Sequence, residues 1–226
     1  MKGAMKRLWI LPITFLAIAA SQVGVAAAGN SCSSEKADPN TASISFFSSQ
    51  NANANWTKTE PPPGDTDPWS VELTVGPANP TGFAGACLRG FEGLPAPPNA
   101  PSYDFKSSTI GPSLGSPRLV VEFSDGGNIQ LRPLFWLDGV WIKEGLDIGP
   151  TMLDWDNSGG SCGFLYEQHY QVVKACHTGF NITQVFVVSD SGAAYPNGYT
   201  NWIDNIQFYG TCFTAPGSTN NSKNGC

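Results

Sequence analysis

The stretch RLVVEFSDGGNIQLR (118–132) decides the fold class, because it has the pattern of two short strands joined by a tight turn. Alternate residues in each half are apolar. Matching the two apolar faces pairs Phe123 with Ile129 and leaves 125–127 (DGG) as a three-residue loop. A loop of this length needs a left-handed residue, which glycine provides at low cost. The stretch predicts an antiparallel hairpin with Glu122 as a solvated acid on its outer face.

Alternating or β-rich runs of the same kind recur along the chain, separated by turn residues. With 25 Gly, 18 Pro and 13% charged residues, the composition is not helical, and no apolar run has helical spacing. The pattern predicts an all-β fold, an antiparallel β-sandwich of the jelly-roll type. The expected strands are 43–48, 70–75, 83–88, 118–123, 128–133, 140–144, 164–173, 182–188 and 202–209.

The first 28 residues have the features of a secretory signal peptide. Lys2, Lys6 and Arg7 precede the apolar run LWILPITFLAIAA, and VAAAGN supplies small residues for cleavage after Ala28. We expect a secreted protein with a single β-sandwich domain over 29–214 and a C-terminal tail over 215–226.

The charge balance excludes two classes of partner. Three of the 12 Lys and Arg residues lie in the leader, so the mature chain has 9 against 18 Asp and Glu, a net charge of −9. An acidic surface repels nucleic-acid phosphates and anionic lipid, and no later stretch is apolar enough to insert into a membrane.

The cysteines predict disulfides rather than a metal site. Their number is even, the chain is expected to be exported, and there is no CxxC motif. Cys162 and Cys176 flank a segment that can fold back on itself, so we predict that they bond to each other. The six cysteines are Cys32, Cys87, Cys162, Cys176, Cys212 and Cys226.

The segment FLYEQHYQVV (164–173) carries the candidate catalytic residues. Alternation places Glu167 and His169 on one face of the expected strand. A carboxylate and an imidazole side by side can perform acid–base chemistry, although the same pair also suits an ordinary polar face. Glycoside hydrolysis needs a second carboxylate, which the sequence does not locate.

Aromatic residues are the candidate ligand-binding groups. Exposed rings suit the apolar faces of sugars. The loop SGAAYPNGYTNW (191–202) brings Tyr195, Tyr199 and Trp202 together among small and turn-forming residues, and loops commonly carry function. Most Trp residues of a β-sandwich are instead expected in its core or rim. The tryptophans beyond the leader are Trp56, Trp69, Trp136, Trp141, Trp155 and Trp202.

Asp204, in the segment WIDNIQFY (202–209), shares the alternation parity of Ile206 and Phe208 and is therefore expected to face the core. A buried carboxylate must be hydrogen-bonded, paired or bound to a metal. The preferred interpretation is a structural role that anchors the preceding loop. Calcium ligation is the second interpretation and catalysis the third.

The C-terminal half resembles a known class of domain. VFVVSDSG (185–192) followed by NWIDNIQFYG (201–210) is similar to the last two strands of secreted bacterial β-jelly-roll domains related to carbohydrate-binding modules, which are galactose-binding-like. In those modules an Asp of the last strand commonly helps to bind a structural calcium, and Asp204 matches that position. The usual acidic partner is missing from the first expected strand, SISFFSSQN (43–51).

These observations favour non-catalytic recognition of an extracellular polysaccharide or another cell-surface ligand, without a cofactor apart from a structural calcium. A small secreted glycoside hydrolase or lyase that uses Glu167 with another acid is the alternative. A structural or adhesive envelope protein is a further alternative.

Overall fold

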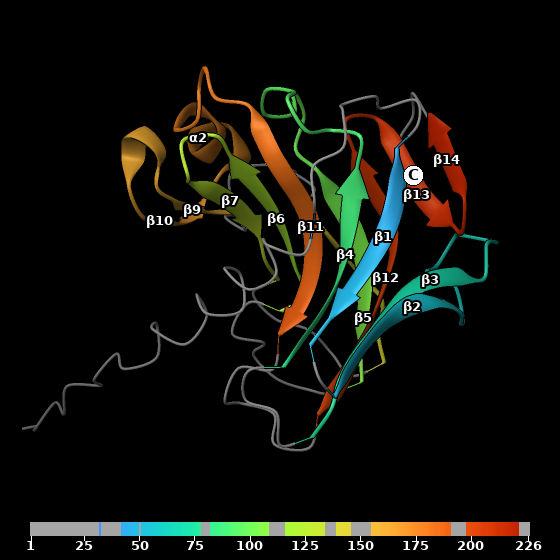
Figure 1. Cartoon of the computed structure of the whole chain (residues 1–226). Helices are drawn as coiled ribbons and strands as arrows, with labels where there is room; N and C mark the ends of the chain where they lie inside the picture. Colours follow the sequence, from blue (N-terminus) through green and yellow to red (C-terminus); the bar gives the residue numbers. More distant parts are fainter. Residues whose placement is uncertain are drawn as a thin grey trace, which may run out of the picture.

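The computed structural model describes residue 32 and the ranges 42–49, 51–77, 82–108, 116–133, 139–145, 155–190 and 198–221. Two antiparallel sheets pack face to face, which confirms the predicted all-β sandwich (Figure 1). Within these ranges, no helix combines the length and the apolar character needed to cross a bilayer.

The first sheet, sheet A, has seven strands, and each neighbouring pair is antiparallel. β1 and β10 are its edges. In spatial order its strands are β1 (Ser43–Ser48), β4 (Phe83–Arg89), β11 (Ile182–Asp190), β6 (Arg118–Phe123), β7 (Asn128–Leu131), β9 (Trp155–Ser158) and β10 (Leu165–Gln168).

The second sheet, sheet B, is built around the long strand β12. β12 pairs with β3 and β13 and also with β5, and β5 pairs in turn with β8. β13 and β14 carry the sheet beyond residue 214, into the segment expected to be a tail. The strands are β14 (Ser218–Asn221), β13 (Thr211–Ala215), β12 (Tyr199–Phe208), β3 (Trp69–Val75), β2 (Ala52–Lys58), β5 (Ser102–Ser107) and β8 (Ile142–Glu144).

The core lies between the sheets and follows from strand alternation. On β3, Val71 and Leu73 face inward and are fully buried, whereas Glu72 between them is partly exposed. Phe105 of β5 and Leu119 of β6 join them in one apolar cluster. Each such side chain contributes about 1.5–3 kcal/mol through burial, so the alternation fixes which face of sheet B remains outside.

The hairpin at 118–132 forms with the predicted loop length but a different register. Val121, not Phe123, is the partner of Ile129, and Phe123 N–H donates to Gly127 O at 2.9 Å. The three-residue loop is therefore 124–126, with Gly126 at φ 81°. A shift of two residues preserves which faces are apolar, so alternation could not detect it.

Residues 164–173 do not form the predicted strand. β10 ends at Gln168, and a short helix, α2, spans Tyr170–Ala175. Tyr170 and Val173, which are three residues apart, are both buried, and the Tyr170 hydroxyl donates to Pro97 O at 2.7 Å. This helical spacing of two core side chains overrode the alternating pattern.

The described cysteines are all in disulfides. Cys162 bonds to Cys176, which confirms the predicted pair, and Cys32 bonds to Cys87. Cys212 is also disulfide-bonded, and Cys226 lies outside the described residues. Such bonds are typical of an oxidising compartment.

Strand β12 contains a bulge that reverses its faces. Asn205 adopts φ 49°, and the pairing with β5 shifts between Asp204 and Gln207. Ile203 faces the core before the bulge, and Ile206 faces it afterwards. The predicted parity of Asp204 with Ile206 was therefore wrong, since the left-handed residue inserts one extra position.

Candidate functional site

A row of cross-strand partners crosses the outer face of sheet B. Trp202 of β12 lies opposite Lys106 of β5 on one side and Glu72 of β3 on the other. Glu72 lies in turn opposite Asn55 of β2. The row points away from the core because the adjacent residue Ile203 is fully buried in it.

Lys106 lies between two indole rings. Its Nζ is 5.2 Å from the centroid of Trp202 and 5.1 Å from that of Trp141, which immediately precedes β8. Both rings and the lysine are partly exposed. A cation held over indole rings is attracted by their quadrupoles, so the three side chains order one another. We call Trp141, Lys106 and Trp202 the indole platform.

Hydrogen bonds fix the members of the platform. Trp202 Nε1 donates to Glu72 Oε2 at 3.2 Å, and Trp141 Nε1 donates to Glu60 O at 3.0 Å. Lys106 Nζ donates to Thr59 Oγ1 at 3.4 Å. Both indole N–H groups are thus satisfied from the protein, and the planes of the rings are set before any ligand arrives.

The segment that supplies Glu60 and Thr59 is the proline-rich loop 59–68. Its two ends are joined by a hydrogen bond from Thr59 N–H to Pro68 O at 2.8 Å. Inside it, Asp65 accepts from the N–H of Asp67, and Asp67 accepts from the N–H of Trp69. The loop is therefore a folded support for the platform rather than a linker.

Beside the platform, Asp104 and Asp204 are directly opposed on β5 and β12. Their relative exposures are 7% and 1%. Asp104 accepts from Asn205 Nδ2 at 2.8 Å, and Asp204 Oδ1 accepts from the Asn205 N–H at 2.7 Å. Asp204 Oδ2 is buried and has no hydrogen-bond partner among the residues that the structure describes.

Burial controls the protonation of this pair. Desolvation raises the pKa of Asp204 to about 8, and the carboxylates of Asp65, Asp104 and Asp67 act in the same direction. Desolvation also raises the pKa of Asp104, against the opposing effects of Asn205 and Lys143. At neutral pH Asp204 is therefore mainly a neutral acid.

Calcium ligation by Asp204 stays a prediction. That ion takes about six to eight oxygen ligands. In the part of the chain that the structure describes, no three His, Cys, Asp or Glu side chains lie close enough together to hold a metal. A calcium site at Asp204 would therefore need backbone or side-chain amide carbonyl oxygens among its ligands.

The three aromatic residues of loop 191–202 that were predicted to bind a ligand do not lie together on one described surface. Trp202 reaches the outer face as a platform member. Tyr199 is 6% exposed, and its hydroxyl is hydrogen-bonded to Ser116 Oγ and Asp190 O, so its ring closes the sandwich and is not available for stacking on a ligand. Tyr195 lies outside the described residues.

The predicted acid–base pair is separated by the end of β10. Glu167 adopts φ 54° and is 59% exposed through its side chain, whereas His169 occupies the N-cap of α2. Glu167 instead lies beside Asp156. Its N–H donates to Asp156 Oδ1 at 2.9 Å, and its carboxylate is 3.8 Å from Arg132, which is itself ion-paired with Asp156.

One acid differs from its prediction, and two residues of the site were not predicted at all. Glu122 lies on the outer face of sheet A, but it is only partly exposed, and Gln184 Nε2 donates to it at 3.0 Å. Desolvation raises its pKa, so it is not a fully solvated acid. Asp104 and Lys106 were missed, although the stretch SYDFKS (102–107) alternates polar and apolar residues and could have predicted β5.

Comparisons with known proteins provide no family assignment. No protein-family model matches the sequence, and no curated protein matches it significantly. Solved structures with a similar arrangement include an arabinose-bound GH51 α-L-arabinofuranosidase (16% identity, TM-score 0.34, 70% of this chain and 22% of that chain). A second is an exo-β-agarase (13% identity, TM-score 0.39, 78% of this chain and 24% of that chain). A third is a β-1,2-glucanase from Parabacteroides distasonis (14% identity, TM-score 0.37, 81% of this chain and 24% of that chain). This chain thus spans about a quarter of the length of each of these three proteins.

Proposed function

We propose that the protein is a secreted, non-catalytic binding protein that recognises a neutral extracellular polysaccharide through the indole platform. The observation that carries the proposal is the position of Lys106 between two partly exposed indole rings, Trp141 and Trp202. The platform lies on a sheet face, where an extended chain of sugars can lie across several strands.

Fixed indole rings suit the weakly polar faces of sugar rings. Stacking removes the C–H groups of a sugar and the ring surface from water, which gains about 25 cal/mol per Å² of apolar area. Because Glu72 and Glu60 already hold the indole N–H groups, binding costs little additional side-chain entropy.

Polar side chains around the platform can meet the sugar hydroxyls. Asn53 and Asn55 lie on the neighbouring strand β2, and Thr74 and Thr200 form a cross-strand pair with their hydroxyl oxygens 2.9 Å apart. Amide and hydroxyl groups can both donate and accept, as sugar hydroxyls do. These groups supply orientation, whereas the rings supply contact area.

Charge favours a neutral ligand over an anionic one. Asp65, Asp67 and Glu60 lie on the loop that supports the platform, and Glu72 lies within its row. The whole chain has a net charge of −6. A polyanionic glycan would be repelled by this surface, whereas a neutral one has no such penalty.

Among the described residues, two pairs of carboxyl groups bear on the catalytic alternative, and neither favours it. Asp104 and Asp204 are too deeply buried to reach a glycosidic bond. Asp156 is occupied by Arg132, which lies between it and Glu167. A glycosidase needs one acid and one base or nucleophile, both accessible to the substrate.

Affinity electrophoresis in gels that contain hydroxyethyl cellulose, xylan, arabinan or laminarin tests the proposal. The wild-type protein should be retarded by at least one of these neutral polysaccharides, and Trp202→Ala should weaken the retardation. Trp69→Ala is the matched control, since Trp69 also lies under a lysine, Lys58, at 5.0 Å but outside the row. Retardation that is unchanged in Trp202→Ala would place the site elsewhere.

A further inference from the structure

We propose a second polysaccharide-binding site on the β9–β10 hairpin, formed by Phe164, Tyr166, Glu167 and Arg132 and called here the hairpin surface. One molecule could then hold two polysaccharide chains at once. The inference rests on the proposed function for its ligand class, but it depends on different residues and can fail independently.

The hairpin is a rigid support. The Cys162–Cys176 disulfide ties the turn η2 (Gly160–Cys162) to the end of α2, and Ser161 N–H donates to Cys176 O at 3.0 Å. A rigid support presents its side chains without an ordering cost on binding.

Buried His177 joins this support to the sandwich. Its Nδ1 lies 2.8 Å from Asp125 Oδ2 in the β6–β7 turn, and its Nε2 lies 2.8 Å from Asn157 Oδ1 on β9. The imidazole also stacks on Phe123, with the ring centroids 4.4 Å apart. The base of the hairpin is therefore fixed by three side chains from three segments.

The rings of the hairpin surface are unusually exposed for this protein. Phe164 is 61% exposed and Tyr166 is 48% exposed, the two largest values among the exposed large hydrophobic side chains of the described residues. They are two residues apart in the chain: Phe164 immediately precedes the edge strand β10, and Tyr166 lies within it. Exposed aromatic side chains on a fixed backbone are typical of recognition surfaces.

Planar polar groups gather around Glu167, the residue that follows Tyr166. Asp156 holds the Arg132 guanidinium through Nε and through Nη2, the latter at 3.4 Å, and the exposed carboxylate of Glu167 lies 3.8 Å from the same guanidinium. A fixed guanidinium and an adjacent carboxylate offer donors and acceptors side by side, which suits neighbouring hydroxyls of a sugar. Since Arg132 is balanced by two acids, the surface does not select an anion.

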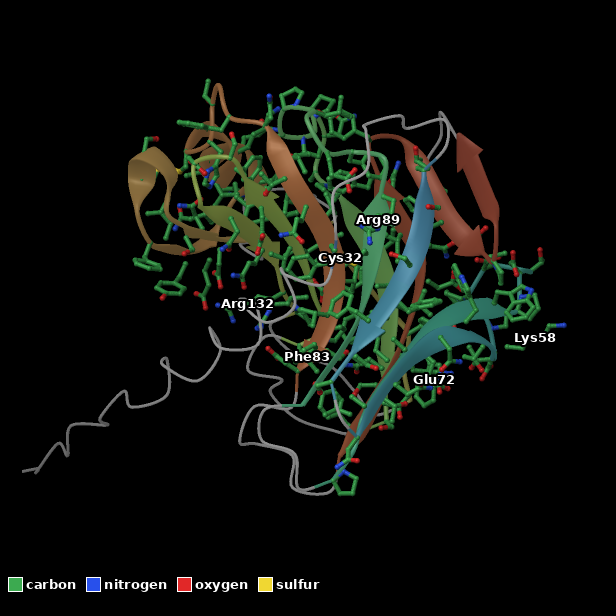
Figure 2. The ribbon with its side chains drawn as sticks, in the orientation of Figure 1. Cys32, Lys58, Glu72, Phe83, Arg89 and Arg132 are labelled. Atoms are coloured by element: carbon green, nitrogen blue, oxygen red, sulfur yellow. A yellow bond between two sulfur atoms is a disulfide. The ribbon has the colours of Figure 1, made fainter. Side chains whose placement is uncertain are left out.

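The two sites face different ways. The indole platform lies on the outer face of sheet B, whereas β10 is the edge of sheet A farthest from β1. Figure 2 shows Glu72, which belongs to the row of the platform, and Arg132 on opposite sides of the molecule. Two separate chains can therefore be bound without competing for space, and binding would cross-link them.

The test uses the full chain in the same four affinity gels, together with light scattering of soluble hydroxyethyl cellulose, xylan, arabinan and laminarin. The variants are Trp202→Ala, Phe164→Ala/Tyr166→Ala and the three changes combined. We expect each site variant to weaken retardation about tenfold and the combined variant to abolish it. Cross-linking, seen as protein-dependent scattering, should vanish in either site variant. Phe180→Ala is the control, because Phe180 is an exposed phenylalanine on the turn after α2.

The outcomes separate the two proposals. If Phe164→Ala/Tyr166→Ala is retarded and scatters like the wild type while Trp202→Ala does not, the second site is overturned and the platform stands. If only the hairpin variant loses binding, the platform is overturned and the hairpin surface stands. If the hairpin variant keeps its polysaccharide binding but loses binding to a protein that the wild type captures, the surface belongs to a protein partner and the inference is wrong. An absence of binding to all four polysaccharides overturns both.

Discussion

Asp104 and Asp204 face each other across β5 and β12, and only Asn205 donates to them among the hydrogen bonds that the structure describes there. The left-handed conformation of Asn205 allows its N–H to reach one acid and its side chain the other. The pair is stable at neutral pH because the proton on Asp204 removes one of two negative charges that would otherwise face each other.

The free energy of unfolding should fall as the pH rises from about 4 to about 8. The folded-state pKa of Asp204 is raised from 3.8 to about 8, so in this window the folded protein holds a proton that the unfolded chain has released. The slope from this group is up to about 1.4 kcal/mol per pH unit and disappears above pH 8. The raised pKa of Asp104 acts in the same direction.

Denaturant titrations of the wild type and of Asp204→Asn at several pH values check this. The variant should lose the Asp204 part of the slope and become more stable than the wild type on the alkaline side. Glu167→Gln, which removes an exposed carboxylate, should keep the wild-type slope. Parallel curves for the wild type and Asp204→Asn would show that Asp204 ionises normally.

Chelation is expected to leave the melting temperature unchanged. Asp204 and Asp104 do not form a cluster of three metal-ligating side chains with any described residue. Differential scanning fluorimetry with EDTA, followed by added calcium, measures the effect. A drop in melting temperature with EDTA that calcium reverses would show that a metal binds the native state. The interpretation of Asp204 as a protonated acid would then be wrong.

The sequence was sufficient for the class of fold and for much of the strand pattern, since alternating runs such as 43–48 and 118–123 became β1 and β6 with those bounds. It predicted that Asp204 is buried, but not the bulge at Asn205, whose side chain bonds to Asp104, 101 residues earlier in the chain. It could not assemble the indole platform for the same reason: Trp141 and Trp202 meet over Lys106 only after three strands pair.

Removal of the Cys162–Cys176 disulfide should lower the free energy of unfolding by about 3 kcal/mol, as expected for a closed loop of this size. The two cysteines are separated by 14 residues. Urea titration of Cys162→Ser/Cys176→Ser measures the change, and Trp202-dependent binding should persist because the platform lies on the other sheet. Loss of platform binding in a folded double variant would contradict this separation.

Gly85→Ala should destabilise the sandwich by about 1–3 kcal/mol through overpacking. A Cβ at Gly85 would collide with the ring of Phe47, its cross-strand partner, which is packed against Phe83 and Phe186. In a Phe47→Leu background the same substitution should cost less, because the shorter side chain can move aside. Equal costs in both backgrounds, measured by urea titration, would show that the collision is not the cause.

Lys106→Met should weaken polysaccharide binding while leaving the protein folded. Methionine keeps an unbranched apolar stem between Trp141 and Trp202, but it removes the cation over both rings and the hydrogen bond to Thr59 Oγ1. The loss of the cation–π contacts should cost about 0.5–1 kcal/mol in stability. Less fixed rings should raise the Kd in the affinity gels by about two- to tenfold. Lys58→Met, which removes the lysine over Trp69, should share the small stability cost but not the loss of binding. If both variants bind like the wild type, the order of the rings does not depend on Lys106, and the contribution of the platform to binding comes from its two indole rings.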